Sequence, residues 1–171
     1  MGYGAVVLIY IAIGANLPNE AGREPVQSCR EAAARLAALP GLRLDALSHW
    51  YDSAPVPASD QPRYINGIAA LEGAVPPAWL LGALQRIESQ AGRVRGALNA
   101  ARVLDLDIVD MGGLLRDGPD PVLPHPRAHL RAFVLYPLRD IAPGWVHPRL
   151  GTPIDALIAA LPAADIGVLG G

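Results

Sequence analysis

The sequence predicts an α+β fold built on an antiparallel sheet, and three observations lead to this prediction. Four segments of strand length are either apolar and β-branched or alternate between apolar and polar residues. Two amphipathic segments with helical spacing separate the first strand from the second and the third from the fourth. Glycine and proline clusters stand between these segments. A chain of 171 residues suits one domain with a full core, so we expect residues 1–171 to form a single domain.

The first three elements are a strand, a helix and a strand. Val6–Ile13 is an apolar, β-branched run that stops at a Gly-Ala-Asn turn. Pro25–Leu39 has apolar residues near helical spacing and is followed by Pro-Gly. Leu42–Tyr51 alternates, which predicts a strand with one apolar face made of Leu42, Leu44, Ala46 and Trp50.

The next elements follow a stiff connection. Asp52–Pro62 contains three prolines and is expected to be a long loop. Tyr64–Leu71 is the third predicted strand, and a helix opens at Pro76-Pro77 and runs to about Ala91. Val103–Met111 is the fourth predicted strand, ended by two glycines.

The remainder predicts irregular and helical additions. Asp117–Pro126 is rich in proline, and Arg131–Arg139 can form a short helix. Thr152 and Pro153 suit the N-cap and first turn of a last helix that reaches Leu161. The order β-α-β-β-α-β is the ferredoxin-like pattern, an antiparallel sheet with helices on one face, here with C-terminal helical additions.

Composition excludes several classes of function. The formal net charge is −2, so no basic field favours nucleic acid. The N-terminal apolar run lacks a positive leader and is too short to span a bilayer, so we expect a cytoplasmic protein without a membrane partner. All fourteen basic residues are arginine. Without lysine there is no P-loop lysine and no protein-kinase lysine.

The sharpest chemical feature is the pair Asp105 and Asp107 on the fourth predicted strand. Side chains alternate along a strand, so both carboxylates face one way, about 7 Å apart. Two carboxylates on one face suit Mg²⁺, which keeps waters and shares phosphate oxygens. An isolated pair of this kind is also found on half-solvated strands that bind nothing.

The residues just upstream favour the metal interpretation. Arg93 and Arg95 lie in a glycine-flanked segment, and Arg102 comes three residues before Asp105. Guanidinium groups beside a carboxylate pair are what a site for polyphosphate and metal requires. A solvated basic loop remains the alternative. From pattern alone, structural roles are favoured over binding roles for Tyr64, Asn66 and His125.

Taken together, these motifs resemble the 6-hydroxymethyl-7,8-dihydropterin pyrophosphokinase family. The matching pieces occur in the family's order from about Val7 to Pro143, and they are Ile11–Leu17, Asp60–Asn66, Gln85–Glu88, Gly92–Arg95, Arg102–Ile108, and Pro124–Pro126 with Arg131 and Phe133. The resemblance implies an αβα sandwich and the transfer of diphosphate from ATP to a pterin alcohol, with release of AMP. It also implies a monomer that acts on these two small molecules.

The resemblance further implies a role for each matching residue. Asp105 and Asp107 would bind two Mg²⁺ ions, and Arg93 and Arg102 would act during transfer. The ATP side would consist of Gln85, Glu88, Arg95, Ile108, His125 and Arg131. The pterin side would consist of the ring residues Tyr64 and Phe133, the polar residue Asn66, and the segment Ser53, Ala54, Pro55 and Val56.

This sequence departs from the family pattern at three places, and one is the segment between Arg95 and Arg102, which is one residue shorter. Asn99-Ala100-Ala101 replaces the usual proline-containing triplet before Arg102, so an aromatic lid from that loop is not expected. Ala54 stands where proline is common. The segment 144–171 shows no chemical motif.

Two other functions are also compatible with the carboxylate pair. A metal-dependent phosphohydrolase would also need a base to activate water, and the sequence offers no clear candidate. A ligand-binding regulatory module gives no reason for arginines beside Asp105 and Asp107. Formation of AMP from ATP only when the pterin is present separates all three.

Overall fold

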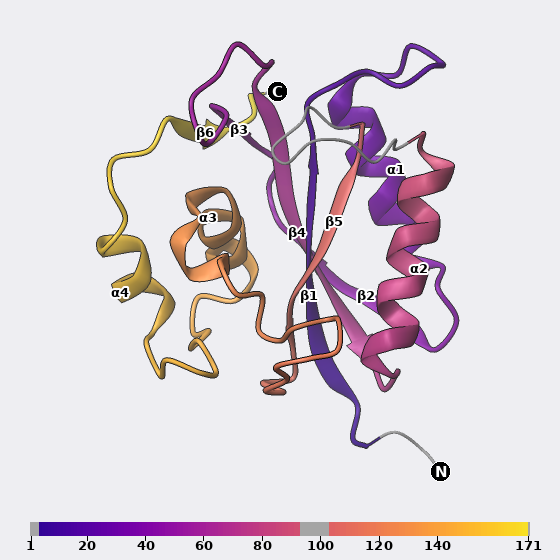
Figure 1. The fold of residues 1–171 in the computed structure, drawn as a ribbon, viewed down its shortest axis with the longest axis vertical. Helices are drawn as coiled ribbons and strands as arrows, with labels where there is room; N and C mark the ends of the chain where they lie inside the picture. Colours follow the sequence, from indigo (N-terminus) through magenta and orange to yellow (C-terminus); the bar gives the residue numbers. More distant parts are fainter. Residues whose placement is uncertain (1–3, 93–102, 171) are drawn as a thin grey trace.

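The computed structural model describes residues 4–92 and 103–170, which form a mixed α/β sandwich with three layers (Figure 1). The sheet has the strand order β5-β1-β4-β3-β6, and β2 also pairs with β4. All the pairings are antiparallel. In chain order the elements are β1 (Val7–Ala15), α1 (Pro25–Ala37), β2 (Leu42–Leu47), β3 (Tyr51–Ser53), β4 (Tyr64–Gly73), α2 (Pro77–Gln90), β5 (Asp105–Met111), the 3₁₀ turn η1 (Ala128–Leu130), α3 (Ala132–Ile141), α4 (Ile154–Ala159) and β6 (Ile166–Val168).

Helices α1 and α2 cover one face of the sheet. The alternate residues Ile9, Ile11 and Ile13 of β1 are at most 1% exposed and pack against apolar side chains of both helices. Leu106 and Ile108 of β5 enter the same core. Burial of this many branched side chains is the main stabilising contribution on this face. The two helices and the strands they join agree with the element order that the sequence predicts.

Helices α3 and α4 cover the opposite face, so helices lie on both sides of the sheet (Figure 1). Tyr10 of β1 and Ile68 of β4 pack there against Leu135 and Leu138 of α3. Asp110 is buried on β5 and accepts a hydrogen bond from Trp145 Nε1 at 2.9 Å. This second core holds α3 above the sheet, and the first residues of α3 border the pocket described below.

The structure corrects the predicted strand Leu42–Tyr51 in two respects. It is divided into β2 and β3, with a connection between them. A register shift between Leu44 and Ala46 inserts Asp45 as an unpaired residue, because Leu44 pairs with Leu71 while Ala46 pairs with Ala70. Such a bulge turns the following side chains over. Ala46 therefore packs on the α3 side rather than on the face shared by Leu42, Leu44 and Trp50.

The C-terminal segment differs from its prediction as well. Helix α4 begins at Ile154 with Pro153 at the N-cap position, and no side chain caps it, so Thr152 does not have the expected role. Beyond α4 the chain returns to the sheet and forms β6, a strand that the sequence does not predict. β6 pairs with β3 at the edge of the sheet.

No helix in the described ranges 4–92 and 103–170 is long and apolar enough to cross a membrane.

Candidate functional site

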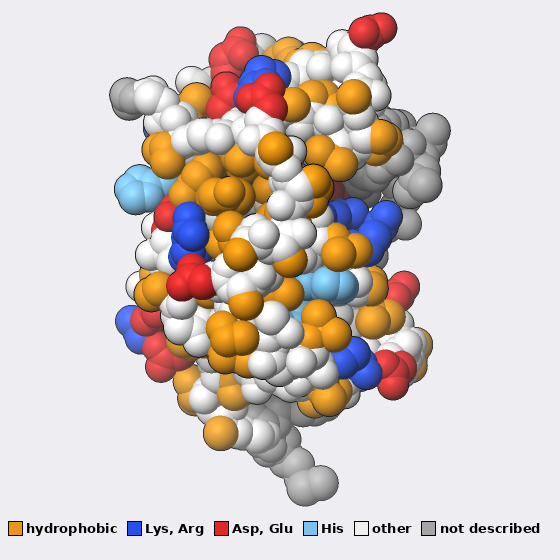
Figure 2. Space-filling model, turned by 90° about the vertical axis from the view of Figure 1, so that its left-hand side faces the viewer, with side chains coloured by type: hydrophobic (Ala, Val, Ile, Leu, Met, Phe, Trp, Pro, Cys, Tyr) orange, Lys and Arg blue, Asp and Glu red, His pale blue; other side chains and the backbone are white. Residues whose placement is uncertain are grey.

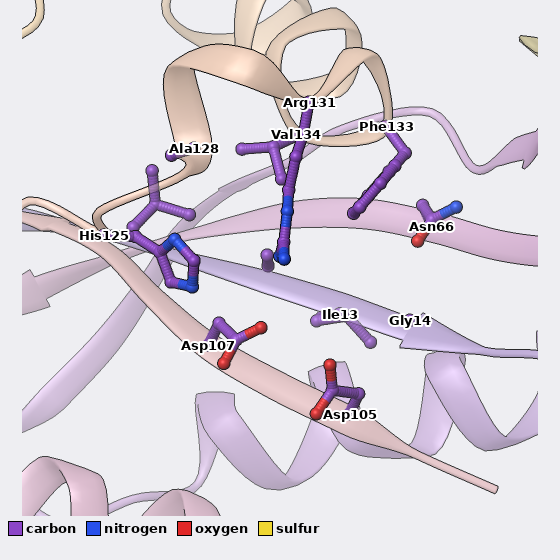
Figure 3. Close-up of a pocket in the computed structure, with 12 residues that line it drawn as sticks. Ile13, Gly14, Asn66, Asp105, Asp107, His125, Ala128, Arg131, Phe133 and Val134 are labelled. Atoms are coloured by element: carbon purple, nitrogen blue, oxygen red, sulfur yellow. The ribbon is translucent and has the colours of Figure 1, made fainter. Parts of the chain in front are cut away.

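A pocket lies between the sheet and the start of α3, and six of the predicted site residues line it (Figure 3). It has about 360 Å³ of empty space, which includes space open to solvent. Side chains from three adjacent strands form its floor, and the segment 125–134 forms its roof. The lining residues are Ala12, Ile13, Gly14, Asn66, Asp105, Asp107, Val109, His125, Ala128, Arg131, Phe133 and Val134.

The carboxylates of Asp105 and Asp107 both face this pocket, as the alternation of the strand predicts (Figure 3). Leu106, between them, points into the opposite core. Across the sheet, Asp107 pairs with Ala12 and Asp105 pairs with Gly14. Because the neighbouring side chains on β1 are so small, the space above the two carboxylates stays open.

His125 enters the pocket from the segment that follows β5. Its main-chain N–H donates to the carbonyl of Val109 at 2.9 Å, which fixes the residue against the strand. Its Nδ1 accepts a hydrogen bond from the main-chain N–H of Arg127 at 3.1 Å. Burial, then the positive charges of Arg131 and Arg127, lower the pKa of His125 to about 4. The ring is therefore neutral at pH 7, and with Nδ1 accepting, its proton resides on Nε2.

Arg131 and Phe133 come from the N-terminal end of α3. The guanidinium carbon of Arg131 lies 5.4 Å from the centroid of the Phe133 ring, within the range of a cation–π contact. Arg131 extends down toward the side of the pocket where Asp107 lies, and Phe133 lies toward Asn66 (Figure 3). The roof thus places a cation on the carboxylate side and an aromatic ring on the amide side.

Asn66 is held on β4 by two neighbours. Its Nδ2 donates to Ser53 Oγ at 2.7 Å, and both side chains are buried. Asn66 also pairs with Gly14 of β1, and a Cβ at Gly14 would lie 2.9 Å from Asn66 Oδ1. Glycine at position 14 therefore leaves room for the amide. Gly14 pairs with Asp105 on its other side, so one row across three strands joins the carboxylate side to the amide side.

We expect Gly14→Ala to displace the Asn66 side chain while the fold survives. The added methyl group would meet the movable end of one side chain, and the nearest backbone atom, the carbonyl oxygen of Ile65, would be 3.7 Å away. If Asn66 binds the flat heterocycle that the family resemblance implies, the affinity for that ligand should fall about tenfold, which corresponds to roughly one hydrogen bond. Calorimetric titration with reduced hydroxymethylpterin measures this loss. Gly144→Ala is the matched control, because a Cβ there meets nothing within 4 Å, and a loss equal in both variants would contradict the assignment.

The carboxylate pair fits magnesium better than a metal that demands a complete protein cage. The residues in the ranges 4–92 and 103–170 include no group of three or more His, Cys, Asp and Glu side chains able to hold a metal ion. Two carboxylates alone leave most coordination positions to water and substrate oxygens. Mg²⁺ is typically bound in that way, through one or two carboxylates and the phosphates of a substrate.

Several predicted residues do not line the pocket. Ser53 contacts it through Asn66, whereas Ala54, Pro55 and Val56 stay outside its lining. Tyr64 is also outside the lining, and its hydroxyl donates to Gln61 Oε1 at 3.2 Å.

On the α2 side, Gln85 is exposed, and Glu88 is buried with Oε2 accepting from the main-chain N–H of Leu106 at 2.8 Å. The Ile108 side chain lies in the α1–α2 core, on the face away from the pocket. Its side chain therefore does not contribute to the pocket. Arg93, Arg95 and Arg102 lie outside the described residues, so their roles stay predictions.

The residues that sequence reasoning missed are small or apolar. Ala12, Gly14, Ala128 and Val134 line the pocket without carrying a chemical group. Ala12 and Gly14 could have been found from the loss of side-chain size along the first strand, from Tyr10 to Ala12 to Gly14.

Comparisons with known proteins agree with the motifs. The family model described as 7,8-dihydro-6-hydroxymethylpterin-pyrophosphokinase (HPPK) matches residues 10–143. The chain is 44% identical over 163 residues to the 2-amino-4-hydroxy-6-hydroxymethyldihydropteridine pyrophosphokinase of Pseudomonas aeruginosa, covering 95% of this chain and 97% of that protein. It is 37% identical over 144 residues to the protein of the same name from Haemophilus influenzae, covering 84% of this chain and 87% of that protein.

A solved structure shares the fold. Wild-type HPPK-DHPS of Plasmodium falciparum matches with a TM-score of 0.63 at 13% identity, over 91% of this chain and 44% of that longer chain. The family match extends over both the strands that form the floor of the pocket and the segment that forms its roof. The chain therefore belongs to the 7,8-dihydro-6-hydroxymethylpterin-pyrophosphokinase family.

Proposed function

We propose that this protein transfers the diphosphate group of ATP to the hydroxymethyl group of 6-hydroxymethyl-7,8-dihydropterin, with release of AMP, in folate biosynthesis. The observation that carries the proposal is the row Asp105–Gly14–Asn66 across three paired strands. Neighbouring strands lie about 4.8 Å apart, so the carboxylate and amide sides are separated by about 10 Å. That span accommodates a phosphate chain at one end and a flat ring at the other.

In this reaction the pterin hydroxymethyl oxygen attacks the β-phosphorus of ATP. A new O–P bond forms, the bond to the α-phosphate oxygen breaks, the hydroxyl proton is lost, and AMP leaves. Positioning and charge stabilisation supply most of the catalysis in phosphoryl transfer. The residues of the pocket are therefore assigned to binding and orientation, and none is assigned a covalent bond to substrate.

On the metal side, Asp105 and Asp107 would hold two Mg²⁺ ions together with phosphate oxygens. Bound magnesium would offset the negative charge of the phosphates. His125, neutral and protonated on Nε2, is suited to donate a hydrogen bond to a phosphate oxygen rather than to accept a proton. Arg131 would pair with the same phosphates.

On the ring side, Phe133 would stack on the pterin and Asn66 would bind its polar edge. An amide both donates and accepts, so it can orient a ring that stacking alone leaves free to rotate. Ser53, Ala54, Pro55 and Val56 with Tyr64 would complete this side after the pterin binds. The ATP side would be completed by Gln85, Glu88, Arg95 and the backbone of Ile108.

The same proposal extends to the arrangement of the whole chain. Treating β2 and β3 as one interrupted strand gives the order β5-β1-β4-β2/β3, which supports a ferredoxin-like arrangement. We infer a single domain over residues 1–171 and a cytoplasmic monomer that acts on small molecules alone.

The proposal is tested by incubating the protein with ATP, Mg²⁺ and the reduced hydroxymethylpterin, and measuring AMP. AMP should form only when all three are present, one molecule for each pterin diphosphate. AMP or ADP without the pterin would indicate a phosphohydrolase instead. Pterin binding without any turnover would indicate a binding module.

We expect Arg93→Ala and Arg102→Ala to lower kcat by about 100-fold or more, with little change in pterin affinity. A group that stabilises charge in the transition state contributes several kcal/mol to kcat and little to ground-state binding. Single-turnover AMP formation and calorimetric pterin titration separate the two effects. Arg149→Ala serves as control, since Arg149 pairs with Asp117 away from the pocket. A loss confined to the dissociation constants would contradict this role.

A further inference from the structure

The C-terminal strand β6 is attached to the sheet mainly by polar contacts. Ile166 is half-buried, Gly167 is exposed, and Val168 is 56% exposed. The main-chain N–H of Ala54 donates to the carbonyl of Asp165 at 3.0 Å, and that of Leu169 donates to the carbonyl of Trp50 at 2.8 Å. Because little apolar area is buried, local opening of this strand costs only a small free energy.

Arg63 links this strand to the two segments beside it. Its Nη1 and Nη2 donate to the two carboxylate oxygens of Asp165 at 2.8 and 3.0 Å, and its Nε donates to Asp52. Hydrogen bonds from Arg63 hold the pKa of Asp165 below its ordinary value, so the pair is ionised at neutral pH. Acidic and basic side chains lie together at the top of Figure 2, the end where Figure 1 places β3 and β6.

This polar cluster is linked to the pocket through Ser53. Asp52 precedes Ser53 on β3, and Ser53 Oγ accepts the hydrogen bond that fixes Asn66. β3 has three residues, and its two sheet neighbours are β4 on one side and β6 on the other. Without β6, the short strand that carries Ser53 would be an unsupported edge, and such edges open readily.

We propose that Arg63 and Asp165 are positioning residues for the ring side of the pocket, because through them β6 keeps Ser53 and Ala54 in place beside Asn66. The inference rests on the proposed function, since it concerns the binding of the pterin. It gives the C-terminal segment a part in substrate affinity although that segment contributes no residue to the pocket lining.

The test compares Asp165→Ala and a variant that ends at Ala164 with the unaltered protein. An exposed bidentate ion pair is expected to change KM for the pterin about three- to fivefold. Removal of β6 also removes its main-chain hydrogen bonds, so the shortened variant should raise this KM about tenfold or more. KM for ATP and kcat should stay within about twofold of their original values.

Matched variants separate positioning from general stability. Arg149→Ala breaks the Arg149–Asp117 pair, where the arginine is 44% exposed, as Arg63 is. It should leave KM for the pterin unchanged. The double variant Arg63→Ala with Asp165→Ala should be little worse than Arg63→Ala alone, because both remove the same bridge. Arg63→Lys keeps the charge and should restore part of the affinity.

Two results would overturn the proposal while the proposed function stands. One is an unchanged KM for the pterin in both Asp165→Ala and the shortened variant, when the unaltered protein turns over normally. The other is a fall in kcat that follows the melting temperature with KM unaltered, which would make the contacts structural only. If the unaltered protein forms no AMP, the proposed function fails and this inference fails with it.

Discussion

Asp105→Asn and Asp107→Asn should each reduce AMP formation by about 1000-fold or more at saturating Mg²⁺, while the protein stays folded. Each change keeps the shape of the side chain and removes the negative charge that faces the pocket. By offsetting negative charge, bound metal ions lower the activation free energy of such transfers by several kcal/mol, and about 4 kcal/mol corresponds to 1000-fold in rate. The fold should persist because both side chains are only half-buried and face the pocket rather than the core.

The measurements are AMP release across a range of Mg²⁺ concentrations and the thermal melting temperature. Asp45→Asn is the control, because Asp45 is an exposed carboxylate on another strand, outside the pocket lining. Near-normal turnover in either pocket variant would remove the metal site from the proposal. Loss of turnover together with a melting temperature lowered by many degrees would assign the carboxylates a structural role.

Phe133→Ala should weaken pterin binding far more than ATP binding. Burial of an aromatic face contributes about 1.5–3 kcal/mol and stacking adds about 0.5–1.5 kcal/mol, so the pterin affinity should fall about 30-fold or more. Phe133→Leu keeps the apolar bulk and should recover only the burial part. Isothermal calorimetry with each ligand gives the two affinities.

Leu130→Ala is the matched control, since Leu130 is 63% exposed on the preceding 3₁₀ turn and does not line the pocket. Phe133→Ala should also lower the ATP affinity slightly, because the Arg131 guanidinium loses its contact with the ring. An equal loss for both ligands would contradict the assignment of Phe133 to the ring side.

Periodicity predicted the parts of the fold whose residues face a core. The first strand was found because it is a continuous apolar, β-branched run, and the helix that begins at Pro77 because its apolar positions recur at helical spacing. The bulge at Asp45 was missed because one inserted residue becomes visible only through its pairing partners on β4. Strand β6 was missed because it is three residues long, is largely exposed, and is determined by distant contacts with β3.

The site was predictable where residues carry a chemical group. The family resemblance assigns Asn66, Asp105, Asp107, His125, Arg131 and Phe133 to one site, and all six line one pocket in the structure. Their individual roles stay predictions. The bond from Asn66 to Ser53 and the support from β6 depend on packing between segments that no local pattern connects. Side chains alternate along β5, so Asp107 faces the pocket while the next residue, Ile108, points into the core on the opposite face of the sheet.

The decrease in side-chain size along β1 leaves space for a ligand on the α3 face of the sheet. On the α3 face, Tyr10 is packed in the core, Ala12 borders the pocket, and Gly14 leaves the strand bare between Asp105 and Asn66. A molecule bound there gains packing contacts with the exposed strand. Because the substrate binds the folded protein and not the unfolded chain, it should raise the melting temperature of the protein. Substrate binding and the stability of the folded sheet are therefore coupled at two small residues of one strand, Ala12 and Gly14.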